Sequence, residues 1–179
     1  IATYEPAKLI LIDQAETPMH DLMLEVKSRW SMLDALFIVC SITNKERMEA
    51  IFDKWKPDYV FHAAAYKHVP MMEDNPGVSI QNNVVGTRIL ADLAVKNNVK
   101  KFVMISTDKA VNPTNVMGCS KRLCEIYVQS LNAYLLKSSD ETTGKTQFVT
   151  TRFGNVLGSN GSVIPLFKKQ IEAGGPVTV

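Results

Sequence analysis

Five short, continuously apolar runs constrain the fold of this sequence more than any other feature. Each is bounded by turn residues, and they lie at residues 8–13, 35–40, 59–64, 101–106 and 147–153. Continuous rather than alternating apolarity is typical of parallel strands that are covered on both faces. Helical patterns lie between the runs, at residues 19–30, 44–55, 78–97 and 116–137. Strands that alternate with helices predict a doubly wound α/β fold with a parallel sheet.

The length and the turn signals predict a single domain over residues 1–179. A chain of 179 residues, of which 46% are hydrophobic, is long enough to bury one core. Thr43 and Glu46 have capping-box spacing at the start of the second helical pattern. The polar stretch 138–145 is too short for a domain linker, and we expect a surface loop there.

Composition argues against several kinds of partner. The 20 Lys and Arg residues and 18 Asp and Glu residues leave a net charge of +2 without a basic block, so no nucleic acid is expected. The apolar runs are far shorter than the roughly 20 residues of a bilayer helix, so we expect no membrane contact from this segment. Three cysteines without Cys-x-x-Cys spacing, and no export signal, favour a cytoplasmic location. His62 and His68 have no third ligand arranged near them, so no metal is expected.

The usual start of a dinucleotide-binding fold is missing from the pattern. Such folds open with a strand, a G-x-G-x-x-G turn and a helix, and an acidic residue about 20 positions later binds the adenosine ribose. This sequence has no such turn, but Asp13 closes its first recognisable strand. We therefore expect the first β-α unit to have been cut away and this segment alone to bind cofactor poorly. Asp13 is then either the ribose ligand or an ordinary turn former.

The other strand ends carry small and reactive residues, and ligands in these folds bind beyond the carboxyl ends of the strands. The third run is followed by Ala63-Ala64-Ala65, which allow either the close approach of a flat cofactor or tight helix packing. The fourth is followed by Ser106-Thr107-Asp108-Lys109. Met117 and Lys121 are four residues apart near the start of the next helix and share one of its faces. That face could look back toward Ser106.

At these residues the sequence resembles the extended, nucleotide-sugar-modifying branch of the short-chain dehydrogenase/reductase superfamily. There, a strand-end Ser or Thr and a Tyr-x-x-x-Lys helix form the redox site, whereas here Met117 stands at the tyrosine position. Four runs, at residues 62–70, 106–111, 113–118 and 152–159, look like the UDP-N-acetylglucosamine 4,6-dehydratases of bacterial capsule, O-antigen and protein glycosylation pathways. Several members of that family carry Met-x-x-x-Lys. The resemblance extends from residue 9 to residue 179.

The resemblance implies a Rossmann-like NAD-binding domain that lacks its first β-α unit and most of its C-terminal substrate domain. Substrate-binding elements would begin in residues 152–179. It further implies a UDP-N-acetylhexosamine as substrate, NAD as cofactor with NADP as the alternative, and a homo-oligomer in the complete protein. Many family members carry transmembrane helices before the catalytic domain, so the parent of this chain is either membrane-anchored through such segments or not anchored.

The implied reaction has three stages. Hydride leaves C4 for the nicotinamide, water is eliminated across C5 and C6, and the hydride returns to C6. By family analogy Lys109 is the base at C5 and Asp108 the acid at C6, which requires a neutral lysine and a protonated carboxyl group. In another context such an Asp-Lys pair would be a solvated ion pair.

The base for C4 oxidation stays open, because the thioether of Met117 has no proton to exchange. The candidates are Asp108, a water held by Thr107 or Ser106, and Lys121 through solvent. We favour the water or Asp108, and Met117 is then either a substitute for the tyrosine or an ordinary helix-packing residue.

Further roles follow from the same resemblance. Lys121 binds the nicotinamide ribose, with Ser106 beside the cofactor, and Asn83 either supports Lys121 through solvent or simply bends its helix. Arg152 and Asn155 follow the last strand, where the family binds the sugar nucleotide, and their side chains suit diphosphate and hydroxyl recognition. Lys67 is either a ligand of a substrate phosphate or a solvated lysine.

Two other functions compete with the dehydratase. A nucleotide-sugar 4-epimerase shares the oxidation at C4 but needs no acid-base pair at C5 and C6, so Asp108 and Lys109 disfavour it. A dinucleotide-sensing protein without chemistry would not need Asp108, Lys109 and Lys121 together. Product formation by the complete protein separates these functions.

Overall fold

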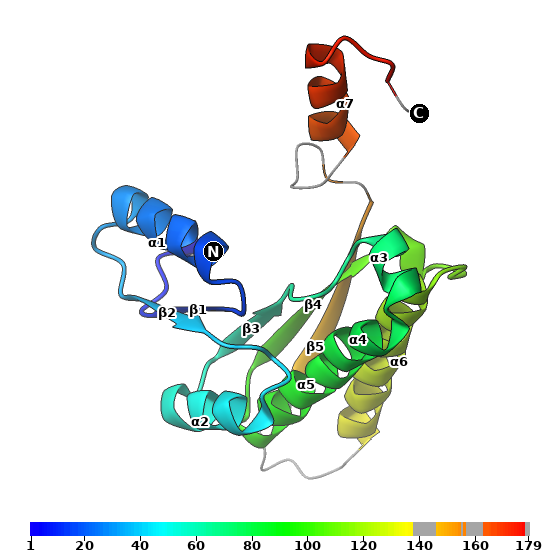
Figure 1. Cartoon of the computed structure of the whole chain (residues 1–179). Coiled ribbons are helices and arrows are strands. Elements are labelled where there is room, and N and C mark those ends of the chain that lie inside the picture. The colour runs from blue at the N-terminus through cyan, green and yellow to red at the C-terminus, as the bar shows by residue number, and fades with distance from the viewer. Residues whose placement is uncertain (138–145, 155, 157–162, 178–179) are drawn as a thin grey trace.

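The fold consists of parallel β-strands connected by helices (Figure 1). The computed structural model describes residues 1–137, 146–154, 156 and 163–177. The strands are β1 Leu9–Asp13, β2 Ala35–Val39, β3 Tyr59–His62, β4 Lys101–Thr107 and β5 Gln147–Phe153. The predicted parallel α/β fold is confirmed, but the strands form two ladders, β1-β2 and β3-β4-β5. They are separate because no strand among the described residues pairs between β1 and β3.

Helices connect the strands and account for most of the remaining described residues. They are α1 Glu16–Arg29, α2 Lys45–Trp55, α3 Val69–Asp74, α4 Pro76–Ser79, α5 Gly86–Lys96, α6 Val116–Lys137 and α7 Val163–Glu172. The helix predicted at 78–97 consists of the end of α4, a π-helical turn at Ile80–Val85 and α5. The loop predicted at 138–145 lies outside the described residues. Within the described ranges, no helix is long and apolar enough to cross a bilayer.

The predicted start of α2 was wrong by one residue. The capping residue is Asn44 rather than Thr43, because the Asn44 side chain accepts a hydrogen bond of 3.1 Å from the backbone N–H of Arg47. Thr43 instead shares a hydrogen bond of 2.9 Å with the hydroxyl of Ser41. An asparagine is as good a cap as a threonine, so local spacing alone does not separate the two.

The core lies between the β3-β4-β5 sheet and the helices α2, α5 and α6, which cover the same face of that sheet (Figure 1). Alternate residues of β4 are buried: Phe102, Met104 and Ser106. The Phe102 ring lies 5.3 Å from that of Phe148 on β5, centroid to centroid. Because side chains alternate along a strand, this burial fixes which residues of β4 face the helices.

The opposite face of the same sheet carries large apolar side chains that are exposed. They are Tyr59 and Phe61 on β3 and Val149 and Phe153 on β5. The sheet therefore carries one phenyl ring, Phe102, on the face covered by helices and another, Phe61, on the uncovered face.

We expect Phe102→Ala to lower the free energy of unfolding of this chain by about 3–5 kcal/mol, because a fully buried phenyl ring is lost and a cavity is left. Phe61→Ala is the matched control and should cost less than about 1 kcal/mol, because 51% of Phe61 is exposed. Urea unfolding measures both values. Equal losses would contradict the assignment of the covered face.

Candidate active site

The end of β4 gathers three polar side chains into one cluster. Thr107 is the last residue of β4, and Asp108–Ala110 form a 3-10 turn directly after it. The Thr107 hydroxyl donates to Oδ1 of Asp108 at 2.9 Å and accepts from the backbone N–H of Lys109 at 3.3 Å. Nζ of Lys109 donates to the same Oδ1 at 3.2 Å. A Cβ added at Gly154 would lie 3.8 Å from Oδ2 of Asp108, so the end of β5 adjoins this cluster.

Asp108 is ionised at neutral pH in this arrangement. Hydrogen bonds from Thr107 and Lys109 lower the pKa of its carboxyl group below the ordinary value, and the side chain is exposed. The proton donor expected at C6 needs the opposite state. To act as that donor, Asp108 would first have to gain a proton.

The first turn of α6 is held against this cluster. Its backbone N–H groups at Val116 and Gly118 donate to Oε1 of Glu73 at 2.6 Å and to Oδ1 of Asn115 at 2.7 Å. A Cβ at Gly118 would lie only 2.3 Å from the carbonyl oxygen of Lys109. Glycine at this position is therefore what lets the helix approach the Asp108–Ala110 turn so closely.

Met117 and Lys121 lie on one face of α6, as predicted, and both are buried. Burial lowers the pKa of Lys121, against the opposing effects of Cys124 and Glu125. Met117 offers no group for proton transfer. Lys121, one helical turn after Met117, does carry such a group, and burial destabilises its ammonium form.

Asn83 ties the loop after β3 to α6. Its side-chain amide donates to the hydroxyl of Ser120 at 2.9 Å and to the carbonyl of Tyr66 at 3.1 Å, and its Oδ1 accepts from the Tyr66 N–H at 2.8 Å. Ser120 lies between Met117 and Lys121 in the sequence. Asn83 stands in the π-helical turn, a kind of irregularity frequent at functional sites. The solvent-mediated support of Lys121 stays a prediction.

A small pocket of about 80 Å³ opens at the carboxyl ends of β1 and β3. Its lining includes Asp13, Ala64 and Ala65, three of the residues predicted to bind cofactor. Oδ1 of Asp13 accepts from the backbone N–H of Ala15 at 2.8 Å, so Asp13 also forms the turn after β1. Ala63, the residue before Ala64, is exposed and does not line the pocket. The turn-forming role of Asp13 is therefore observed, and its role as a ribose ligand stays a prediction.

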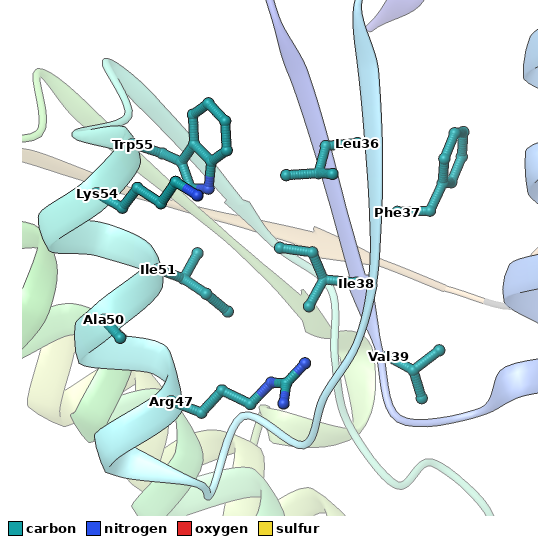
Figure 2. A pocket seen from close by; sticks show the side chains of 9 residues that line it. All are labelled: Leu36, Phe37, Ile38, Val39, Arg47, Ala50, Ile51, Lys54 and Trp55. Atoms are coloured by element: carbon teal, nitrogen blue, oxygen red, sulfur yellow. The ribbon is translucent and has the colours of Figure 1, made fainter.

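A larger pocket, of about 480 Å³, lies between β2 and α2 and contains none of the predicted site residues (Figure 2). Leu36 and Ile38 point toward α2, whereas Phe37 and Val39 point to the other side of the strand (Figure 2). Despite its larger volume, this pocket is not the candidate site, because the predicted catalytic side chains lie at the end of β4 and in the first turns of α6.

His62 belongs to the core. Its Nε2 lies 2.8 Å from the hydroxyl of Thr87, and burial together with the charge of Lys121 lowers its pKa to about 3, so its ring is neutral. Among the described residues, no group of three His, Cys, Asp or Glu side chains is placed to hold a metal ion.

The residues predicted to bind substrate are not all brought together. Lys67 is exposed in the loop between β3 and α3. Arg152 lies in β5 and forms a bidentate ion pair with Glu125 of α6. Asn155 lies outside the described residues. Substrate contact by these three residues stays a prediction.

Sequence reasoning missed Glu73, Gly118 and Glu125. Glu125 was detectable in part, because it lies four residues after Lys121 on the same helical face. Glu73 gave no local signal, since it caps a helix that begins 43 residues later.

The parallel fold, the Ser-Thr-Asp-Lys strand end and the Met-x-x-x-Lys helix together define a domain of the short-chain dehydrogenase/reductase superfamily. The model of the polysaccharide biosynthesis protein family matches residues 1–179. The chain belongs to this family.

Curated relatives carry names from two reaction types. The chain is 48% identical over its whole length to the capsular polysaccharide biosynthesis protein CapD of Staphylococcus aureus, of which it spans 29%. It is 35% identical over 99% of its length to a UDP-N-acetylglucosamine 4,6-dehydratase (inverting) of Campylobacter jejuni, of which it spans 51%. A UDP-glucose 4-epimerase of Rickettsia canadensis is 47% identical over 68% of the chain and is spanned to 34%. The chain thus spans about half or less of the length of these relatives.

Solved structures agree with the fold. Pen from Bacillus thuringiensis superposes with a TM-score of 0.83 at 33% identity, over 97% of this chain and 52% of that one. The Bordetella bronchiseptica enzyme WbmG, solved in complex with NAD and UDP, superposes with a TM-score of 0.66 at 26% identity, over 93% of this chain and 52% of that one.

We expect Gly118→Ala to displace the Asp108–Ala110 turn, because the added methyl group would collide with the Lys109 carbonyl. A strained core contact of this kind costs about 1–3 kcal/mol. The Tm should fall by about 2–4 °C for each kcal/mol. Gly77→Ala is the control, since a Cβ there meets nothing within 4 Å. Calorimetry of both variants suffices, and equal Tm values would refute the close approach.

Proposed function

We propose that the complete protein is a nucleotide-sugar 4,6-dehydratase that acts on UDP-N-acetylglucosamine in bacterial surface polysaccharide or glycan biosynthesis. The observation that carries the proposal is the hydrogen-bonded Thr107, Asp108 and Lys109 cluster, against which Gly118 allows the start of α6 to pack. It supplies a carboxylate and an amine at one strand end. Elimination needs one proton donor and one proton acceptor, and these side chains are of the two types required.

The relative from Campylobacter jejuni supports a dehydratase and a UDP-N-acetylhexosamine substrate. The epimerase relative supports a second candidate function, nucleotide-sugar 4-epimerisation, which also begins with oxidation at C4. Asp108 and Lys109 favour elimination, since epimerisation has no use for an acid and a base at C5 and C6. A product assay with the complete protein tests the choice: a 4-keto-6-deoxy sugar is expected, and a 4-epimer would overturn the proposal.

The side chains that line the small pocket at the carboxyl ends of β1 and β3 support NAD as the cofactor. The acidic side chain of Asp13 suits a ribose with two free hydroxyl groups, and the small side chains of Ala64 and Ala65 leave room for the backbone to approach a flat ring. Bound NAD would supply the hydride acceptor at C4 and the hydride donor at C6. Buried Lys121 would bind the nicotinamide ribose.

Asp108 can serve two stages in turn. Because its carboxylate is ionised at rest, it can accept the C4 hydroxyl proton during oxidation, with Thr107 orienting it. Once protonated, it can donate to the departing C6 oxygen, which leaves as water. Lys109, which is paired with ionised Asp108 at rest, must first release its ammonium proton to solvent. Its free amine can then take the proton from C5 and return it to C5 at the last stage. This path uses no proton from Met117.

Substitutions of Lys109 and Asp108 should block different stages of the reaction in the complete enzyme. Lys109→Ala should still reduce bound NAD on mixing with substrate but should not exchange the C5 hydrogen with heavy water. Asp108→Asn should slow both NAD reduction and dehydration, by about 10²–10⁴-fold, since it removes the C4 base and the C6 acid together. Single-turnover absorbance of reduced nicotinamide and deuterium incorporation by NMR separate the two cases.

Asp58 and Lys100 provide matched controls. They form an exposed ion pair of 2.8 Å before β3 and β4, at the other end of the sheet. Asp58→Asn and Lys100→Ala should keep the wild-type rate. Dehydration by Lys109→Ala at a near-normal rate would rule out Lys109 as the base, and normal NAD reduction by Asp108→Asn would rule out Asp108 as the C4 base.

We expect the complete enzyme to bind NAD more tightly than NADP, by about tenfold or more, because Asp13 would repel the 2′-phosphate. Asp13→Asn should narrow the difference. Glu16→Gln is the control, since Glu16 is a nearby acid in the first turn of α1 that does not line the pocket. Competition titrations measure both affinities. Tighter binding of NADP to the unchanged enzyme would refute the ribose role.

A further inference from the structure

The carboxylate of Glu125 is the most deeply buried charge described above. Its side chain is 0% exposed, and it accepts from three donors on two arginines. Nε and Nη2 of Arg152 donate to its two oxygens at 2.8 and 2.6 Å, and Nη1 of Arg122 donates to Oε2 at 2.9 Å. Burial raises the pKa of Glu125, but the hydrogen bonds from Arg152 and Arg122 outweigh it and hold the pKa at about 2. The charge is therefore permanent near neutral pH.

This ion pair joins the helix and the strand that border the proposed site. Glu125 follows Lys121 by four residues and Met117 by eight, so the three lie on one face of α6. Arg152 lies in β5 directly beside Ser106 of β4 in the parallel register. The residue after Ser106 is Thr107, which begins the polar cluster. A single carboxylate thus connects the Met117 and Lys121 face to the strand ends.

Glu125 binds one of the two edges of the Arg152 guanidinium that carry paired N–H groups. A guanidinium presents pairs of parallel N–H groups to planar anions, and here Nε and Nη2 form such a pair with Glu125. The buried hydroxyl of Ser106 adds to the low pKa of Glu125, although its geometry makes no hydrogen bond within the described part of the chain. Arg152 is therefore anchored to α6 through Glu125, while 41% of its side chain is exposed.

We propose that Glu125 and Arg152 form a positioning pair for the reaction, which sets the Lys121 face of α6 against the ends of β4 and β5. The proposal rests on the proposed function, and it gives Arg152 a role through Glu125 in place of direct contact with substrate. Misplacement of reacting groups by about 1 Å can cost 10²-fold in rate. On this proposal neither side chain touches the sugar nucleotide, so substrate affinity should not change.

The test compares Glu125→Gln, Arg152→Gln and the double variant in the complete enzyme. Each should lower kcat by at least about tenfold while KM and the affinity for UDP stay within about twofold. The double variant should be no slower than the slower single variant, because both changes break one pair. Arg122→Gln is the matched control: it removes a donor from the same carboxylate without separating α6 from β5, so its kcat should stay within about twofold of wild type.

Several outcomes would overturn the proposal. A raised KM and weaker UDP binding in Arg152→Gln, but not in Glu125→Gln, would make Arg152 a substrate ligand. A lower Tm with unchanged kcat in the folded enzyme would make the pair merely structural. Should Glu125→Gln fail to fold, Arg152→Lys keeps the charge and carries the test, with a lower kcat and an unchanged KM expected. Single-turnover NAD reduction is recorded for every variant, because oxidation at C4 is common to dehydratases and epimerases and reports positioning even if the proposed elimination fails.

Discussion

The alternating burial of β4 is the constraint on which the rest of the site depends. Phe102, Met104 and Ser106 face the helices, so the strand cannot shift by one residue without placing its apolar side chains in water. That register, shared with β3 and β5, brings Thr107 to the carboxyl end of the sheet. The turn that follows can then place Asp108 and Lys109 beside the first turn of α6. Core packing thereby decides where the reactive residues lie.

Helix α6 is held at several points along its length by polar contacts rather than by apolar packing alone. Glu73 and Asn115 satisfy its first N–H groups, Asn83 binds Ser120, and Glu125 binds Arg152. Buried polar groups without partners are costly, so each contact favours one position of the helix over its alternatives. In the proposed site, which has Met117 at the tyrosine position, such placement would hold the remaining side chains at fixed distances for proton transfer.

The charge state of Asp108 bears on the order of steps in the proposed reaction. A carboxyl group that begins protonated could act only as an acid, and a buried one would be needed to keep it so. Asp108 is instead exposed and hydrogen-bonded to Thr107 and Lys109, which favours the anion. In the proposed reaction, this one side chain would accept the proton released at C4 and donate it at C6.

The sequence by itself determined the parallel α/β fold, the span of α6 at Val116–Lys137 and the reactive residues at the ends of the strands. These features follow from local periodicity and from residues adjacent in the chain. Tertiary structure decided the division of the strands into two ladders and the pairing of Arg152 with Glu125, 27 residues away. It also decided the contact of Gly118 with Lys109 and the ionised state of Asp108. The reason is physical. The periodicity of a sequence indicates which face of a helix or strand is buried, but the side chains that contact this face depend on how the elements pack together.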